Sequence, residues 1–207
     1  LSHYCMKRII TLVIFLFSAM PVFAQDTYLK WAKQFAGGEM GVFDRGEGIA
    51  VDANGNVYSA GIFTGTIDFD PGPGTYNLTA SGGSNNDIYI SKLDVFGNFL
   101  WAKQITGTAT TLDTKSLALD KDFNVYVSGN FSMTADFDPG PNTFNLTANG
   151  SADAFVLKLT TNGAFVWAKQ MGGLLANTFS NSTATDSFGN IYFTGSYSGS
   201  VDFDPGP

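Results

Sequence analysis

The sequence has one cysteine, Cys5, and one histidine, His3, both at the start of its 207 residues. The remainder of the chain therefore holds no cysteine for a disulfide, a thiolate nucleophile or a cysteine-based metal site. Because it lacks histidine as well, it contains neither a Ser-His-Asp triad nor a histidine-ligated zinc ion. These absences exclude the commonest catalytic and metal centres from everything that follows residue 5.

Positive charge is also scarce, since 11 Lys and Arg stand against 18 Asp and Glu, and the formal net charge is −7. Loss of Lys7 and Arg8 with the leader described below would change it to −9. An acidic chain without a basic cluster argues against nucleic acid and anionic membranes as partners. In contrast, the 19 Phe, 8 Tyr and 24 Gly are typical of a β-rich protein with many turns.

The N-terminal region predicts an export signal at residues 6–24. Two cations follow Met6, an almost wholly apolar run covers residues 9–17, and a relaxed small-residue cleavage pattern ends at Ala24. A transmembrane anchor is the alternative, but the run is shorter than the roughly 20 apolar residues of a membrane span. We therefore expect the leader to be cleaved and the mature chain to have no span. Residues 1–5 precede the predicted start and are interpreted as additional translated sequence.

Two sequence motifs recur about every 66 to 70 residues, and a fixed period of this kind indicates a repeat architecture. A residue that is copied into every repeat usually serves the repeat, whereas a catalytic residue normally occurs once. The motif Asp-Phe-Asp-Pro-Gly-Pro begins at Asp68, Asp136 and Asp202, and the motif Trp-Ala-Lys-Gln begins at Trp31, Trp101 and Trp167.

Each repeat predicts four main strands and one small hairpin, which contains the Pro-Gly-Pro sequence. No window after the leader has helical periodicity. Four antiparallel strands per repeat form the blade of a β-propeller. A β-sandwich is the alternative fold, but it would not require a motif copied at this period. In the first copy the four strands are expected near residues 49–51, 56–61, 88–93 and 99–103.

We therefore predict an all-β fold of propeller-like repeats over residues 25–207. Two complete repeats and part of a third cannot close a ring of typically four to eight blades. Because the third copy stops in mid-repeat, we expect an incomplete ring and a sequence that is a fragment of a longer chain. The predicted boundaries are 31–100 for repeat 1, 101–166 for repeat 2 and 167–207 for partial repeat 3.

The first repeat resembles the bacterial SBBP repeat, which is related to β-propellers. Residues 52–61 carry an Asp-x-x-Gly-Asn turn and a Val-Tyr strand ending in Gly, residues 87–94 carry Asp-x-x-x-x-Lys-Leu, and residues 97–104 carry Gly-x-x-x-Trp. The resemblance implies an exported protein of the Bacteroidetes type. It also implies type IX secretion as the route if the full chain has a C-terminal sorting domain. The sequence departs from the SBBP pattern at Phe123, which replaces the turn Gly in the second repeat, and in the added Asp-Phe-Asp-Pro-Gly-Pro hairpin.

The aspartates of that hairpin are the candidate metal ligands. Residues two apart in a strand face the same way, so the two Asp of each motif share a face and the Phe between them packs inward. Either the two carboxylates accept hydrogen bonds in the turn, or they hold one calcium ion per repeat together with carbonyl oxygens. A glycosidase pair normally occurs once, whereas this pair occurs three times. The candidate calcium ligands are Asp68, Asp70, Asp136, Asp138, Asp202 and Asp204.

Other distinctive residues favour structural roles. Asp87 and Asp153 open matching strands, and we expect them to accept hydrogen bonds that brace each blade. The repeated tryptophans are expected to pack between blades, with an exposed ring that stacks on sugar as the alternative. The only cluster of charges that is not repeated lies between Glu39 and Glu47, in what we interpret as a solvated loop.

The sequence as a whole predicts a secreted or cell-surface bacterial protein that acts as a non-catalytic binding or structural scaffold. Its expected partner is an extracellular glycan or protein. We predict no catalytic residues and no cofactor other than calcium. The alternatives are an extracellular carboxylate-based glycan hydrolase or lyase, and the non-catalytic part of a larger exported enzyme.

The calcium hypothesis predicts a stabilisation that calorimetry can measure. If the six aspartates bind calcium, the ion raises the unfolding midpoint of the full chain relative to chelator. At a hundred times the dissociation constant, each site adds about 2.7 kcal/mol to the free energy of unfolding. Replacing all six with Asn should abolish the rise. An unchanged midpoint at millimolar calcium would contradict the metal role and leave the carboxylates as turn acceptors.

Overall fold

The structure of the chain, a computed structural model, is built from β-strands, and the predicted all-β class is confirmed. No helix of the described residues has the length and apolar character needed to cross a membrane. The predicted signal peptide and the five residues before it lie outside the described residues. The structure describes residues 29–37, 44–81, 86–108 and 111–204.

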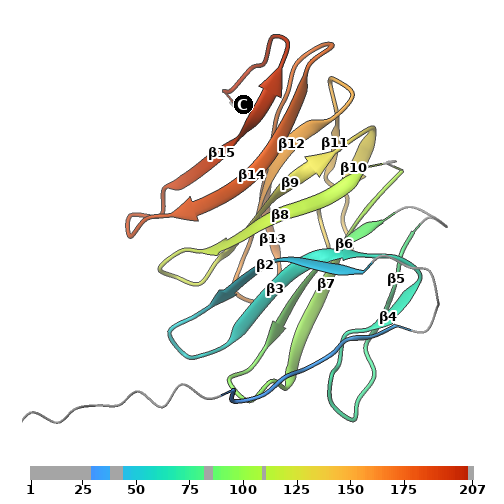
Figure 1. Ribbon diagram of the computed structural model, residues 1–207, viewed down its shortest axis with the longest axis vertical. Helices are drawn as coiled ribbons and strands as arrows, with labels where there is room; N and C mark the ends of the chain where they lie inside the picture. Colours follow the sequence, from blue (N-terminus) through green and yellow to red (C-terminus); the bar gives the residue numbers. More distant parts are fainter. Residues whose placement is uncertain (1–28, 38–43, 82–85, 109–110, 205–207) are drawn as a thin grey trace, which may run out of the picture. The chain divides into compact units, whose positions relative to one another are not determined.

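Two sets of four antiparallel strands form what we call the first and second blades (Figure 1). The first set belongs to a six-stranded sheet, and the second is a four-stranded sheet of its own. The four strands of each blade pair in the order in which they follow one another along the chain, as in a propeller blade. The first blade consists of β2 (Arg45–Val51), β3 (Val57–Phe63), β6 (Asp87–Leu93) and β7 (Phe99–Gly107). The second consists of β8 (Leu112–Leu119), β9 (Val125–Phe131), β12 (Asp153–Leu159) and β13 (Phe165–Met171).

The third blade is represented by two antiparallel strands, β14 (Asn177–Thr185) and β15 (Ile191–Ser198). The first strands of the three blades, β2, β8 and β14, run beside one another (Figure 1). The backbones approach closely there, since a Cβ on Gly48 would lie 2.8 Å from the backbone nitrogen of Leu117. The predicted incomplete ring of propeller-like blades is thus confirmed.

In the first two blades a small hairpin follows the second strand and pairs with a strand that precedes the blade in the sequence; we call it the strap hairpin. In the second blade it joins β7 of the first blade through Ala135–Gly107 and Asp136–Thr106 pairs. The strap hairpin of the first blade pairs in the same way with β1. The strands concerned are β1 (Ala36–Gly37), β4 (Thr66–Asp68), β5 (Asn77–Thr79), β10 (Thr134–Asp136) and β11 (Asn145–Thr147).

The core lies between the sheets, and the strap hairpins contribute to it. Phe69 and Phe137, the central residues of the Asp-Phe-Asp motifs, are buried, as predicted. The ring of Phe137 packs 5.3 Å from that of Phe131 and 4.8 Å from that of Phe155, measured between centroids. The strap hairpin is therefore held by apolar packing as well as by backbone pairing.

One glycine of each second strand is required by close contact with the neighbouring strand. A Cβ on Gly129 would overlap the carbonyl oxygen of Asp113 and lie 2.8 Å from a ring carbon of Phe155. Gly61 and Gly195 face backbone carbonyls in the same way. Each of these glycines lies beside a register shift in the first strand of its blade. These glycines, which the sequence pattern places at the end of the strand, lie inside it and make room for a β-bulge in the neighbouring strand.

Replacing Gly129 with Ala should lower the free energy of unfolding by about 1–3 kcal/mol, because the added methyl group forces backbone atoms apart. Urea denaturation of the full chain measures this change. The matched control is Gly46→Ala in β2, where the nearest atom to the new Cβ, the Tyr89 hydroxyl, is 3.4 Å away. Equal effects of the two substitutions would contradict the steric explanation.

Candidate functional site

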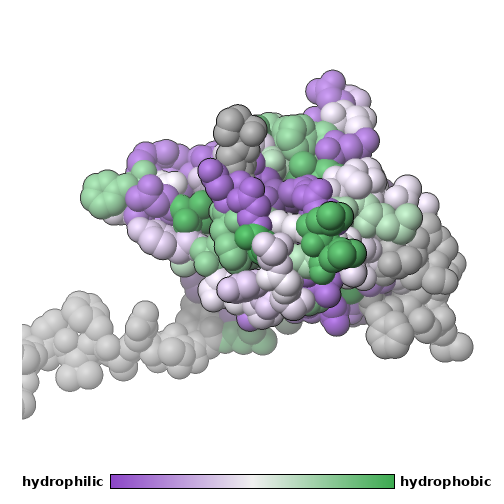
Figure 2. Space-filling view, turned by 90° about the horizontal axis from the view of Figure 1, so that it is seen from above, coloured by the Kyte–Doolittle hydropathy of each residue, from purple (hydrophilic) through white to green (hydrophobic). Residues whose placement is uncertain are grey.

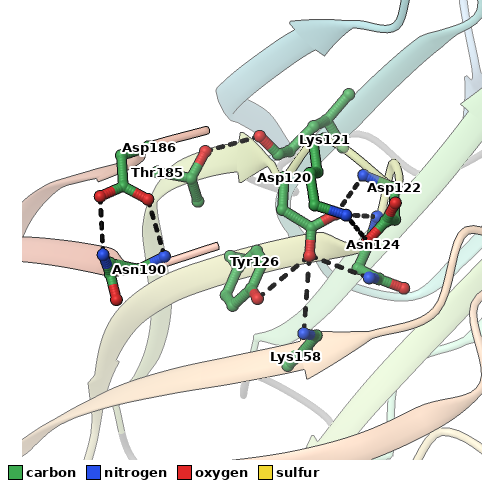
Figure 3. A network of polar contacts seen from close by, with 10 residues as sticks. Asp120, Lys121, Asp122, Asn124, Tyr126, Lys158, Thr185, Asp186 and Asn190 are labelled. Atoms are coloured by element: carbon green, nitrogen blue, oxygen red, sulfur yellow. Dashed lines mark hydrogen bonds and ion pairs between the residues drawn. The ribbon is translucent and has the colours of Figure 1, made fainter. Parts of the chain in front are cut away.

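The turn between the first two strands of the second blade is built around the carboxylate of Asp120 (Figure 3). Its Oδ1 accepts the backbone N–H groups of Asp122 and Asn124, both at 2.9 Å. Its Oδ2 accepts the side-chain amide of Asn124 at 2.9 Å and the hydroxyl of Tyr126 at 3.2 Å. Lys158 Nζ lies 3.5 Å from the same oxygen. Because internal donors occupy both oxygens, this carboxylate serves the turn.

The same turn occurs at Asp52 in the first blade and at Asp186 in the third. In the second blade, Phe123 has a φ of 62° at the position where the other two turns have glycine. A left-handed conformation costs a residue with a Cβ roughly 1–2 kcal/mol. The hydrogen bonds that converge on Asp120 therefore hold a strained turn in place.

Hydrogen bonding lowers the pKa of these turn aspartates. Burial by itself raises the pKa of Asp120, but bonds from Asn124, the backbone and Tyr126 outweigh it, so that the net pKa is below the ordinary value of 3.8. For Asp186 the side-chain amide of Asn190 is the main cause of a lowered pKa. Carboxylates with lowered pKa values are ionised at neutral pH, and they are poor candidates for a catalytic acid.

The candidate calcium ligands lie at the turn end of the strap hairpins, where β4 and β10 end. Asp136 Oδ1 accepts the N–H groups of Asp138 and Phe144 at 3.1 and 2.8 Å, and Asp138 Oδ1 accepts that of Gly140 at 2.8 Å. The first strap hairpin has the same bonds at Asp68 and Asp70. In the third copy, Asp202 accepts the N–H of Asp204 at 2.9 Å. One oxygen of each hairpin aspartate in the first two copies therefore has a turn role.

These aspartates provide only part of a metal-binding site. Calcium takes six to eight oxygen ligands, whereas each strap hairpin contributes two carboxylates. In the part of the chain that the structure describes, no group of three or more His, Cys, Asp or Glu side chains lies close enough to hold one metal ion. Calcium binding by the six aspartates remains a prediction, which the calorimetric measurement decides.

The aspartates that open β6 and β12 brace the blades, as predicted. Asp87 is fully buried, and its Oδ2 accepts the side-chain amide of Gln104 at 2.6 Å. The same amide donates to the carbonyl oxygen of Thr79 at 2.8 Å. Gln170 and Asp153 form the equivalent bond in the second blade, at 3.3 Å. The glutamine of the Trp-Ala-Lys-Gln motif thus fastens the outer strand to its own blade.

The tryptophan of that motif connects neighbouring blades, which confirms the predicted packing for Trp101. Trp101 belongs to β7, and its Nε1 donates to the carbonyl oxygen of Thr161, in the β12–β13 turn, at 3.2 Å. Lys92 Nζ lies 3.2 Å from the Thr161 hydroxyl. Because Trp101 is half-buried in this contact, it is not an open platform for a sugar ring.

The unrepeated charges at the start of β2 pair with one another and with the next blade. Arg45 Nη2 lies 3.1 Å from Asp113 of β8, and Arg45 Nε lies 2.7 Å from Glu47. Asp44 accepts a backbone N–H at 3.1 Å. Glu39 lies outside the described residues. The prediction that this cluster lies in a loop is wrong for Arg45 and Glu47, because both belong to β2. Arg45 also forms an ion pair that crosses from the first blade to the second.

Two equivalent grooves bring the repeated motifs together. Each groove has the outer strand of a blade as its floor, the strap hairpin of that blade on one side, and residues of the following Asp-Phe-Asp motif on the other. The first groove has a volume of about 280 Å³ and is lined by Tyr76, Leu78, Ala102, Lys103, Gln104, Thr106, Asp136, Asp138, Pro139 and Gly140. The second has a volume of about 290 Å³ and is lined by Phe144, Leu146, Asn149, Ala168, Lys169, Gln170, Gly172, Asp202 and Asp204.

The sequence did not predict these grooves. Each motif lies within a single repeat, whereas each groove combines the lysine of one Trp-Ala-Lys-Gln motif with aspartates of the following Asp-Phe-Asp motif. The signal that could have revealed the pairing is the common period of the two motifs, since a hairpin and a strand that recur together are candidates for contact.

Comparison with known proteins agrees with the repeat architecture. A family model described as a beta-propeller repeat, SBBP, matches residues 166–196, which extend from β13 into β15. The chain is also 29% identical over 204 residues to an uncharacterized WD repeat-containing protein, L264, of Acanthamoeba polyphaga mimivirus. That similarity covers 84% of this chain and 14% of the viral protein, so the chain spans a small part of the length of this relative.

Acid should weaken the Asp120 turn in a predictable direction. A carboxyl group whose pKa is lowered in the folded state stabilises the fold above its unfolded pKa, and the stabilisation is lost as the pH falls through the folded pKa. At pH 7, Asp120→Asn should therefore lower the free energy of unfolding by about 1–3 kcal/mol. Below the unfolded pKa of about 4 the difference from the unsubstituted chain should narrow, since Asp120 is protonated first in the unfolded chain and then, at lower pH, in the folded chain.

Urea denaturation between pH 7 and pH 3 measures this difference. The matched control is Asp122→Asn in the same turn, because the Asp122 side chain is exposed and, among the residues that the structure describes, pairs with the exposed Lys121 alone. A destabilisation by Asp120→Asn that is independent of pH would show that the ionised carboxylate is not what holds the turn.

Proposed function

We propose that the chain is a secreted or cell-surface, non-catalytic β-propeller segment that serves as a binding or structural scaffold. The observation that carries this proposal is the use of its repeated polar residues. The turn aspartates, the buried aspartates at the start of β6 and β12, and the motif glutamines all make hydrogen bonds that hold the blades together. Residues engaged in this way in each blade serve the architecture.

The proposed partners are extracellular glycans or proteins. The acidic net charge favours these over nucleic acid. On the face that Figure 2 presents, hydrophilic residues interrupt the hydrophobic ones, which favours recognition through polar groups on that face. The matched family and the printed name of the viral relative both denote repeat proteins, and this supports a scaffold.

We also propose that the chain is exported and that it binds calcium. The leader at residues 6–24 would direct secretion, with the type IX machinery as the route if the full chain carries a C-terminal sorting domain. Calcium would add stability at the strap hairpins. Because the chain spans 14% of the viral relative, the activity of any longer protein belongs to this proposal too.

The non-catalytic role predicts no turnover of glycans. The full chain, incubated with laminarin, arabinoxylan, galactomannan and alginate, should release no reducing ends and no unsaturated products above a protein-free blank. Colorimetric assay of reducing ends and ultraviolet absorbance of unsaturated sugars measure the two. Turnover that disappears in Asp44→Asn or Glu47→Gln would instead support the hydrolase or lyase alternative.

A further inference from the structure

We propose that the two grooves are repeated binding subsites for neutral sugar rings of a polysaccharide. This inference rests on the proposed role as a binding scaffold and assigns it a place. The equivalent positions of the two grooves carry the same kinds of side chain: an aromatic ring, a lysine and two aspartates. These are Tyr76, Lys103, Asp136 and Asp138 in the first groove, and Phe144, Lys169, Asp202 and Asp204 in the second.

Several of these groups retain bonding capacity beyond their structural role. The stem of Lys103 lies beside Gly163 of the next blade, but its amine makes no hydrogen bond or ion pair with the residues that the structure describes. Asp136 and Asp138 each use Oδ1 in the strap hairpin, and neither Oδ2 has a hydrogen-bond partner within the described ranges. The first groove therefore combines an available donor with two available acceptors.

The aromatic residues of the grooves are held on one side and exposed on the other. Tyr76 packs on Phe99 with ring centroids 4.8 Å apart, and Phe144 packs on Phe165 at 4.9 Å. The side chains of Tyr76 and Phe144 nevertheless remain 39% and 38% exposed. A ring that is fixed in this way loses little conformational entropy when a ligand packs against it.

This combination of groups selects the chemical class of the ligand. Two carboxylates repel an anion, and the amine of Lys103 or Lys169 opposes a simple cation. A neutral sugar ring suits all of the groups. Its hydroxyls donate to the carboxylates and accept from the amine, while its apolar C–H face packs on the aromatic ring.

Size and repetition favour a polymer over a small ligand. Each groove is near the lower end of ligand pockets, which hold about 300–1,000 Å³, so it fits one or two sugar rings. Grooves on consecutive blades can be occupied by one chain, and linked binding events raise the overall affinity without new contacts. Several weak subsites that act together are therefore sufficient to bind a polysaccharide.

Affinity electrophoresis of the full chain tests the assignment. Native gels contain laminarin, arabinoxylan, galactomannan or hydroxyethyl cellulose, which are neutral, or alginate, which is anionic. We expect retardation in at least one neutral gel. The double variant Tyr76→Ala/Phe144→Ala should bind about two- to tenfold more weakly, because it loses the aromatic contacts. Lys103→Met/Lys169→Met should also weaken binding while keeping the packed stems.

The matched control is Phe96→Ala/Phe188→Ala, which removes two aromatic side chains that are 73% and 86% exposed outside the grooves, and it should leave retardation unchanged. Thermal unfolding verifies that each variant is folded; if the aromatic variant is not, the lysine variant decides. The assignment would be overturned if no neutral gel retards the chain, or if alginate alone does so. It would also be overturned if both groove variants are retarded as strongly as the unsubstituted chain.

The outcomes also separate this proposal from the scaffold role. A folded chain that neither binds nor cleaves the neutral polysaccharides overturns the grooves as sugar sites and leaves the scaffold. Release of reducing ends in the turnover assay overturns the non-catalytic role and leaves the grooves intact.

Discussion

The structure depends on how the outer edge of each blade is satisfied. The last strand of a four-stranded sheet presents unpaired N–H and C=O groups, which are costly when buried and prone to wrong pairing when exposed. In the first blade, β10 of the next blade covers part of this edge at Thr106 and Gly107. Main-chain hydrogen bonds thus join adjacent blades, and the inward phenylalanine at position 137 adds apolar packing to the same connection.

Features that depend on short sequence separations could be predicted from the sequence. The turn at Asp120 is closed by donors that lie two, four and six residues further along the chain, so its pattern is visible in any one repeat. The bracing role of Asp87 could be predicted as well, since it opens a strand that alternation and composition already indicated. The blade architecture could be predicted from the repetition, because four strands per period are compatible with few all-β folds other than a propeller.

The partner of the strap hairpin could not be predicted in this way. Its sequence indicates two short strands and a turn, but backbone hydrogen bonds do not depend on side-chain identity, so the pattern does not say which edge they join. Asp136 lies opposite Thr106, thirty positions earlier and in a different blade. The grooves follow from this register alone, and they therefore appear only once the strap is placed.

This placement changes what a repeated residue can mean. A residue copied into every repeat serves the architecture, yet one side chain can serve two purposes through different atoms. Asp136 holds its hairpin through Oδ1 while Oδ2 stays available, and Lys103 packs its stem against the next blade while its amine stays available. Selection for blade stability alone would preserve both residues and would also copy the groove. A propeller assembled in this way gains one binding position for each strap, so that adding blades lengthens the surface available to a polymer.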